Sequence, residues 1–325
     1  MEKTLITGVA GFIGSRTAEI LLESGHHIIG IDNLNDYYDP TLKKHRLDIL
    51  KKFENFDFFP IDIENYKELK PIFENNKINK VLNLAARAGV RYSLENPFIY
   101  AQTNFLGSLN LLDLMRLHGI SKYVMASTSS IYTDSEMPFS ENSSVNKPIS
   151  PYAATKKAAE LMGYTYHHQF DLDVTIVRYF TVYGPAGRPD MSVLRFIKSI
   201  KEGKPLVLYG DGTQSRDFTY IDDIAKGTIK ASEKKTGYEI INLGGGNNPI
   251  SMNEIISKIE NLIEKRAIIR REAFHSADVL TTYADITKAK RVLDWEPKIN
   301  INDGLSKTVE WYLRHEKWLS KIDFY

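Results

Sequence analysis

The chain has 325 residues, of which 42% are hydrophobic and 26% charged; these values are ordinary for a globular protein and exclude a disordered one. Its 42 basic and 41 acidic residues give a formal net charge of +1, so the charge balance favours neither nucleic acid nor an anionic membrane as a partner. The absence of cysteine excludes disulfides, thiolate nucleophiles and cysteine metal sites. No run reaches the ~20 apolar residues needed to span a bilayer, and the N-terminus has no signal peptide, so we expect a cytoplasmic protein.

The first thirty residues form a dinucleotide-binding pattern. Residues 3–7 predict a buried parallel strand, and residues 12–22 have helical spacing that stops at Gly25. Gly8, Gly11 and Gly14 lie between and at the start of these elements. Glycines here let the backbone approach a pyrophosphate, and the helix N-terminus supplies free N–H groups and a positive dipole end.

A second strand over residues 27–31 ends at Asp32. A carboxylate at this point can accept both hydroxyls of the adenosine ribose, and it repels a 2′-phosphate. The pattern therefore predicts NAD rather than NADP as the cofactor. The glycine spacing is GxxGxxG instead of GxGxxG, and a glycine-rich turn without a ligand stays open as the alternative.

Strand–helix alternation continues along the chain. Strands are predicted over residues 56–61, 80–84, 122–126 and 174–178, and an amphipathic helix over residues 103–118. Repeated βα units predict an α/β fold with a doubly wound parallel sheet of the Rossmann type. Ligands bind such sheets at the C-terminal ends of the strands, where Ala85, Thr128 and Thr181 fall.

A predicted helix that opens at residues 150–156 carries a candidate general base. Ser150 suits the N-cap and Pro151 the first helical position. Tyr152 and Lys156 are four residues apart and share one face, and a nearby ammonium favours a phenolate, so Tyr152 can act as a base near neutral pH. Thr128 can reach the same space. The alternative is a tyrosine–lysine pair on a helix surface without catalytic function.

Three motifs together resemble the extended short-chain dehydrogenase/reductase family: TGVAGFIG at residues 7–14, STSSIY at 127–132 and YAATK at 152–156. Longer stretches resemble the UDP-glucuronate 4-epimerases of that family; they lie at residues 32–40, 88–97, 180–191, 216–223 and 282–285. The resemblance implies a tightly held NAD+ that is regenerated in every turnover. Tyr152 takes the proton of the sugar 4-hydroxyl, the C4 hydride passes to the nicotinamide, and the 4-keto sugar turns over to accept it on its other face. UDP-glucuronate becomes UDP-galacturonate.

The resemblance also implies roles for site residues. Thr128 hydrogen-bonds the 4-oxygen, and Lys156 holds the nicotinamide ribose and keeps the pKa of Tyr152 low. With the glycine motif, the expected cofactor site comprises Gly8, Gly11, Phe12, Ile13, Gly14, Asp32, Asn33, Asp62, Ile63, Leu84, Ala85, Ala86, Asn104, Tyr152, Lys156 and Phe180. The expected substrate site comprises Arg87, Ser129, Thr181, Arg188, Arg216, His275 and Asp278. We expect residues 1–180 to form the NAD-binding domain, to which the chain returns around 216–245, and residues 181–325 to form mainly a smaller, mixed α/β lobe for the UDP-sugar.

Two arginines are the main candidates for substrate recognition. In the family Arg216 contacts the UDP portion, which suits a diphosphate. Arg188 lies in a Gly-Pro-rich loop just past a strand end and is the candidate for the uronate carboxylate. Solvated surface arginines are the alternative for both. His275 stands where relatives carry glutamine or arginine, and Arg87 replaces a glutamine expected in the uronate epimerases, which adds a positive charge that favours an anion.

Other functions remain compatible with these residues. A 4-keto uronate is a β-keto acid that can lose CO2, so a UDP-glucuronate decarboxylase shares the first step; a UDP-glucose or UDP-N-acetylglucosamine 4-epimerase and a catalytically retired nucleotide-sensing protein are the others. Residues 33–52 form either an ordered cover over the adenosine or a mobile loop. The histidine pairs at 26–27 and 167–168 lack partners at ligand spacing, so we expect no metal site. The family implies a homodimer and a role in polysaccharide supply.

Overall fold

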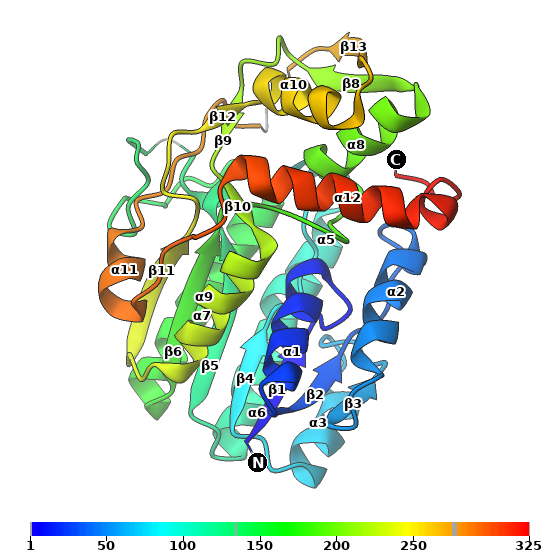
Figure 1. Cartoon of the computed structure of the whole chain (residues 1–325). Coiled ribbons are helices and arrows are strands. Elements are labelled where there is room, and N and C mark those ends of the chain that lie inside the picture. The colour runs from blue at the N-terminus through cyan, green and yellow to red at the C-terminus, as the bar shows by residue number, and fades with distance from the viewer. Residues whose placement is uncertain (1, 134, 275–277, 325) are drawn as a thin grey trace.

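The computed structural model describes residues 2–133, 135–274 and 278–324 and has a seven-stranded parallel sheet at its centre (Figure 1). The strands follow the order β11-β6-β5-β4-β1-β2-β3. Their bounds are Lys3–Thr7 (β1), His27–Ile31 (β2), Phe56–Phe59 (β3), Lys80–Asn83 (β4), Lys122–Thr128 (β5), Asp173–Tyr179 (β6) and Tyr238–Leu243 (β11). Since the order reverses between β1 and β4, the sheet is doubly wound, as predicted.

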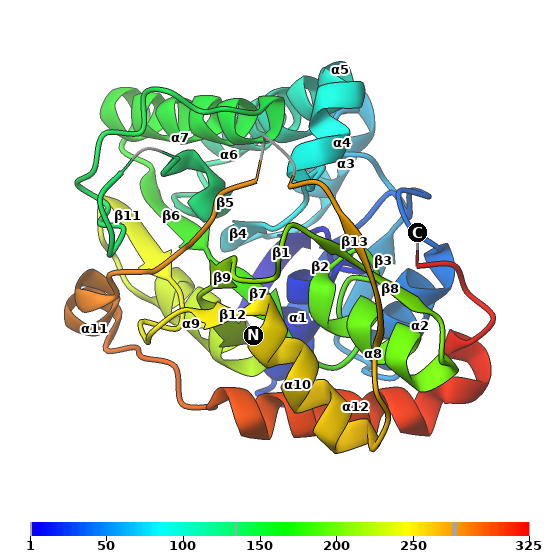
Figure 2. The same cartoon turned by 90° about the horizontal axis from the view of Figure 1, so that it is seen from above.

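Helices cover both faces of the sheet, as the view from above shows (Figure 2). One face carries α1 (Phe12–Glu23), α2 (Pro40–Leu50) and α9 (Ile221–Glu233). The other carries α3 (Tyr66–Asn75), α6 (Gly107–Leu117) and α7 (Pro151–Phe170). The strands β1, β2 and β4 to β6 are almost entirely buried, because helices shield them from water on both sides. This three-layer sandwich fixes the C-terminal strand ends at one edge.

A smaller, mixed α/β lobe lies over that edge (Figure 1). Its two-stranded sheets are β7 with β10, β9 with β12, and β8 with β13. Its own apolar core includes Val193, Phe196, Ile255 and Val309. Its elements are β7 (Thr181–Tyr183), α8 (Ser192–Glu202), β8 (Pro205–Tyr209), β9 (Ser215–Arg216), β10 (Phe218–Tyr220), β12 (Ile250–Ser251), α10 (Met252–Ile263), β13 (Ile268–Glu272) and α12 (Ile301–Leu319). The short helix α11 (Thr287–Leu293) contacts β11 at the edge of the large sheet.

The predicted elements are mostly confirmed, and several of them differ in their bounds. Strand β5 continues past residue 126 to Thr128, because all seven residues are buried although the last two are polar. The predicted strands over 56–61 and 80–84 end earlier, at Phe59 and Asn83. The predicted helix over 103–118 consists of a π-helix, η1 (Ala101–Leu106), followed by α6.

The segment over residues 33–52, for which the sequence left two readings open, is ordered and contains α2. Asp39 caps this helix by accepting a hydrogen bond from Thr41 N at 2.8 Å, and Pro40 occupies the first turn. Lys43 and Arg46 are buried in the same helix, against the usual preference of such side chains for water. Their partners, described below, explain the burial.

Candidate active site

A cavity of about 740 Å³ opens where the C-terminal strand ends face the small lobe. This volume is within the range of small-molecule and cofactor sites. The described cofactor and substrate candidates line it with a single exception, Asn104. His275 lies outside the described residues. The cavity therefore brings together candidate residues that the sequence separates by up to 270 positions, from Gly8 to Asp278.

The glycine turn between β1 and α1 has no room for side chains. Gly8 has a φ of +67°, and a Cβ on it would lie 2.7 Å from the backbone nitrogen of Ala85. A Cβ on Gly14 would lie 2.1 Å from the carbonyl oxygen of Gly8. The α1 N-cap is Gly11, which provides no side-chain cap, so the first-turn N–H groups of the helix stay available for an anion. This cradle fits the pyrophosphate of a dinucleotide.

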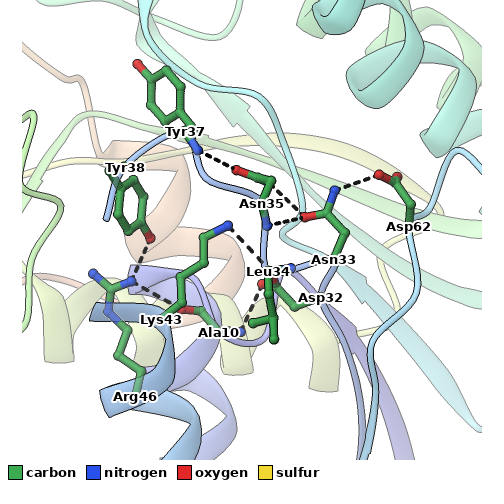
Figure 3. Close-up of polar contacts among 10 residues, drawn as sticks. All are labelled: Ala10, Asp32, Asn33, Leu34, Asn35, Tyr37, Tyr38, Lys43, Arg46 and Asp62. Atoms are coloured by element: carbon green, nitrogen blue, oxygen red, sulfur yellow. Dashed lines mark hydrogen bonds and ion pairs between the residues drawn. The ribbon is translucent and has the colours of Figure 1, made fainter. Parts of the chain in front are cut away.

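Asp32 stands at the end of β2, where the sequence placed the ribose acceptor (Figure 3). The Asp32 carboxylate is buried and accepts hydrogen bonds from Ala10 N at 3.1 Å and Leu34 N at 2.8 Å. The Asn33 side-chain nitrogen donates to Asp62 at 2.6 Å, which joins the two strand ends that were expected to border the adenosine. The contacts hold both carboxylates in fixed positions on the cavity wall.

Helix α2 adds two basic residues beside Asp32 (Figure 3). The ammonium of Lys43 lies 3.8 Å from Asp32 Oδ1. Burial lowers the pKa of Lys43, and the charge of Asp32 opposes this shift. Arg46 donates five hydrogen bonds of 2.7–3.1 Å, to Ala10 O, Tyr38 Oη, Ala186 O (twice) and Gly187 O. Its guanidinium thus ties the glycine turn to the loop that carries Arg188.

The three candidate catalytic residues reach the cavity from two elements. Thr128 ends β5, and Tyr152 and Lys156 lie on the first turns of α7, where Ser150 accepts a capping hydrogen bond from Ala153 N at 3.2 Å. Lys156 is 1% exposed, and its ammonium has no hydrogen-bond partner among the described residues. A buried cation without a partner in a cavity wall fits a site whose ligand supplies the acceptors, such as ribose hydroxyls.

Burial shifts the pKa values of this group. Burial lowers the pKa of Lys156 to about 8, and the negative charge of Glu160 opposes that shift. Burial also raises the pKa of Tyr152, while a hydrogen bond with Thr128 and the charge of Arg188 act in the opposite direction. The sequence-based expectation of a low Tyr152 pKa therefore does not describe the protein without its ligands. The groups that favour the Tyr152 phenolate here are Thr128 and Arg188.

Asn104 lies behind the cavity wall. Its amide donates to Arg87 O at 3.0 Å and Thr155 Oγ1 at 3.2 Å, and its side-chain oxygen accepts from Arg87 N at 2.9 Å. It comes from the π-helix η1, whose wider turn is a frequent feature of functional sites. The structure therefore gives Asn104 a supporting position: it joins the β4–α4 loop to α7.

The loop after β7 carries Arg188, which is paired within the protein. Its Nε and Nη2 donate to the two carboxylate oxygens of Asp190, at 3.0 and 2.5 Å. The hydroxyl of Tyr37 donates to the same carboxylate at 3.4 Å. Arg188 lines the cavity and its charge acts on Tyr152, so it is close to the catalytic group.

At the other end of the cavity, Arg216 and Asp278 lie on the lobe side. Arg216 Nη1 donates to the carbonyl oxygens of Ser215 and Leu280, at 2.8 and 3.1 Å. Asp278 pairs with Arg91 at 2.5 Å, and the Arg91 guanidinium lies 3.7 Å from the ring centroid of Tyr209. This contact joins helix α4 (Val90–Glu95) of the large domain to β8 of the lobe across the cavity.

Arg87, Ser129 and Thr181 are the other substrate candidates that line the cavity. The Arg87 Nε is buried and has no partner among the described residues, so the side chain retains a donor for a ligand. Two hydroxyl side chains also line the cavity. Ser129 follows Thr128 in the chain, and Thr181 is the first residue of β7. The set provides several donors for an anionic sugar.

Some residues of the site had no predicted role. Lys43, Arg46 and Tyr37 lie in the segment whose order the sequence left open, and Arg91 and Asp190 lie in quoted motifs without an assigned function. The spacing of Arg188 and Asp190, two residues apart, is the one local signal that could have indicated their pairing. The other partners come from distant parts of the chain.

The comparisons with known proteins bear on this site. A family model described as GDP-mannose 4,6 dehydratase matches residues 5–308. The chain belongs to that family, within the extended short-chain dehydrogenase/reductases. A relative in this family, the UDP-glucuronate 4-epimerase of Thermodesulfobacterium geofontis, is 62% identical over 307 residues, which cover 94% of this chain and 95% of the relative.

Solved structures of the family show the same fold. The UDP-glucuronic acid 4-epimerase from Bacillus cereus, in complex with UDP-glucuronic acid and NAD, matches with a TM-score of 0.91 and 38% identity, over 96% of this chain and 99% of that one. Another structure of that enzyme has a tyrosine replaced by phenylalanine and contains UDP-4-deoxy-4-fluoro-glucuronic acid and NAD. The UDP-glucose 4-epimerase from Thermotoga maritima, with UDP-glucose, has a TM-score of 0.86 and 30% identity, over 97% of this chain and 99% of that one.

The described part of the chain has neither a candidate membrane span nor a candidate metal cluster. None of its helices combines the length and the apolar run that crossing a membrane requires. The same residues contain no group of three or more His, Cys, Asp or Glu side chains that could hold a metal ion.

Proposed function

We propose that this protein is an NAD-containing isomerase that converts UDP-glucuronate to UDP-galacturonate by inversion at C4. The observation that carries the proposal is that Thr128, Tyr152 and Lys156 line the same cavity as Arg188. A site for removing a hydroxyl proton and a cation for a carboxylate thus share one pocket. The similarity to UDP-glucuronate 4-epimerases over nearly the whole chain supports the same substrate.

The cofactor is held by the wall nearest to β1 and β2. The glycine cradle and the α1 N-terminus bind the pyrophosphate, and Asp32 accepts the adenosine ribose hydroxyls. Lys156 supplies its unpartnered ammonium to the second ribose. When bound, NAD+ takes up the hydride from C4 and returns it to the opposite face of the sugar.

The chain's own residues handle the proton and the substrate. Tyr152 takes the proton from the sugar 4-hydroxyl and gives it back after the 4-keto sugar has turned over, with the Thr128 hydroxyl bonded to the 4-oxygen. Arg188 favours the phenolate form of Tyr152 because opposite charge stabilises it, and the hydrogen bond with Thr128 acts in the same direction. Arg216 and Arg87 bind the anionic groups of the UDP-sugar.

Arg188 also bears on whether the 4-keto intermediate loses CO2. A 4-keto uronate loses CO2 when its carboxylate bond aligns with the carbonyl π system. A guanidinium that grips both carboxylate oxygens fixes the plane of that group. We propose that this grip keeps the reaction an epimerisation.

The test is to incubate the purified protein with UDP-glucuronate without added cofactor and to identify the products by NMR. We expect a mixture of UDP-glucuronate and UDP-galacturonate and no net NADH. A UDP-pentose with release of CO2 would identify a decarboxylase instead. Protein that carries NAD and converts no UDP-sugar would support the binding-protein alternative.

We extend the proposal to assembly and organisation. Large apolar side chains are exposed on α6 and α7, which is unusual unless another surface covers them; they are Leu117, Leu161, Tyr164 and Phe170. We propose that two copies pack through these helices as a homodimer. Light scattering should give the mass of two chains, and Leu161→Glu should reduce it to one.

The division of the chain belongs to the same proposal: residues 1–180 bind NAD, residues 216–245 return to that domain, and residues 181–325 mainly bind the UDP-sugar. The position of β11 in the large sheet supports it, and so does the apolar core of the lobe, to which Phe12 and Leu42 of the large domain also contribute. A cytoplasmic location and a supply of acidic sugars for polysaccharides complete the proposal.

A further inference from the structure

Arg188 already holds a carboxylate of the protein. Its Nε and Nη2 donate to Oδ1 and Oδ2 of Asp190 at 3.0 and 2.5 Å. This two-point contact has the bidentate geometry that a substrate carboxylate would also adopt with a guanidinium. Both residues line the cavity. A uronate therefore meets an arginine that is occupied by a chemical equivalent of its own acid group.

Asp190 has a second partner that stays available when Arg188 leaves. The hydroxyl of Tyr37 donates to Asp190 Oδ2 at 3.4 Å. Tyr37 is held in place from the cofactor side: its backbone N–H donates to Asn35 at 3.2 Å (Figure 3), and its ring packs 5.3 Å from that of Tyr92. The Asp190 side chain is 31% exposed, so it can turn from Arg188 and remain hydrated and bound to Tyr37.

Electrostatics favour a paired guanidinium at this position. A partly buried cation without a counter-ion is costly, so Arg188 needs a carboxylate whether or not a ligand is present. Burial disfavours the charged form of Asp190, but the Arg188 guanidinium holds the pKa of that carboxyl below its usual value. Without substrate, the pocket presents a neutral ion pair.

We propose that Asp190 is a specificity-determining residue that Arg188 exchanges for the carboxylate of an acidic UDP-sugar. The inference rests on the proposed function. A UDP-uronate, anchored by its diphosphate, brings its carboxylate to Arg188 at high local concentration and displaces Asp190 toward Tyr37. A neutral UDP-sugar has no carboxylate to replace Asp190, so it leaves the Arg188–Asp190 pair intact. The exchange sets the affinity for the acidic sugar alone.

The proposal predicts effects of opposite sign for the two partners of the exchange. Asp190→Asn removes the competing carboxylate, so UDP-glucuronate should bind about 3- to 10-fold more tightly. Tyr37→Phe removes the group that receives Asp190, so UDP-glucuronate should bind about threefold more weakly. The dissociation constant of UDP-glucose should change less than about twofold in both. In the double variant the effect of Tyr37→Phe should disappear.

The measurement is calorimetric titration of the NAD-loaded full chain with UDP-glucuronate and with UDP-glucose. A matched control exists on the α3–α6 surface, where Tyr66 donates to Asp113 at 2.9 Å and Asp113 pairs with Arg116 at 2.8 Å. Tyr66→Phe and Asp113→Asn alter the same kind of triad away from the cavity and should leave both dissociation constants unchanged. Asp190→Ser serves if Asp190→Asn does not fold.

Weaker or unchanged UDP-glucuronate binding in both Asp190 variants would overturn the exchange, because it would mean that Asp190 only positions Arg188. Unchanged or tighter binding in Tyr37→Phe would also overturn it. These readouts need no turnover. If the wild-type protein binds UDP-glucuronate but does not epimerise it, the proposed function fails, and the exchange is still decided by the dissociation constants.

Discussion

Lys156 and Glu160 lie one turn apart on α7, and only Glu160 has partners. Its carboxylate accepts hydrogen bonds from Arg178, at 3.0 and 2.8 Å, and from Ser127 Oγ at 2.6 Å. Lys156 has none among the described residues. The Glu160 side chain is fully buried, and its negative charge opposes the lowering of the Lys156 pKa by burial. This pair gives the first prediction.

Glu160→Gln should move the alkaline limb of the pH–kcat/KM profile to lower pH. The pKa of Lys156 is lowered by burial to about 8, so the ammonium is lost as pH rises through that region. Removing the Glu160 charge lowers the pKa further, and the active cation then disappears earlier. The control is Glu202→Gln in the lobe, which removes an acid paired with Lys198 at 2.7 Å. An alkaline limb that keeps its midpoint in Glu160→Gln would contradict the electrostatic role.

Tyr152→Phe should reduce turnover of UDP-glucuronate by ~10²–10⁴-fold, the usual contribution of a general base. Bound NAD should survive, because the phenyl ring keeps its packing 6.1 Å from Tyr100. Turnover is measured by NMR and NAD by release after denaturation. Tyr66→Phe, on α3 away from the cavity, is the control. Activity within a few-fold of wild type would rule out Tyr152 as the base.

Gly8→Ala should abolish NAD binding and lower the melting temperature more than Gly119→Ala. The two glycines have nearly the same φ, +67° and +66°, so the conformational strain of an alanine is the same, about 1–2 kcal/mol. Only Gly8 meets backbone, at 2.7 Å, whereas a Cβ on Gly119 has nothing within 4 Å. Equal destabilisation of both variants, with NAD retained, would show that close approach is not what requires glycine at position 8.

Arg188→Ala should reduce kcat/KM for UDP-glucuronate more than any residual action on UDP-glucose. The substitution removes the cation that pairs with the carboxylate, and a lost charged hydrogen bond of this kind corresponds to about 10- to 100-fold. Arg188→Lys should restore only part of the loss, because an ammonium cannot grip both oxygens in one plane. The same loss on both sugars would mean that Arg188 does not read the carboxylate.

The sequence was most informative where local chemistry decides the conformation. The glycines at 8, 11 and 14 have to be glycine because backbone atoms occupy the space of a Cβ, and this requirement is visible in the motif itself. Asp32 and the Tyr152–Lys156 pair follow from strand ends and helical spacing. In the structure these residues line one cavity.

The remaining site depends on contacts between distant segments, which periodicity does not contain. Arg46 is buried in a helix of low amphipathicity because its partners at Ala10 and Ala186 come from other loops. The π-helix before α6 has the apolar pattern of an ordinary helix, and the partners of Asn104, Arg87 and Thr155, lie in other segments of the chain. The motif suggested Arg188 as a cation for the uronate carboxylate, and it did not indicate that Arg188 pairs with Asp190 of the protein.

The five hydrogen bonds of Arg46 join two neighbouring segments of the cavity wall. One of its nitrogens bonds the turn that cradles the pyrophosphate, and the others hold the backbone just before Arg188. Loss of the Arg46 guanidinium would therefore release the glycine turn and the loop that carries Arg188 together. Coenzyme retention and the choice of sugar thus both depend on this one side chain, and its loss would impair the two together.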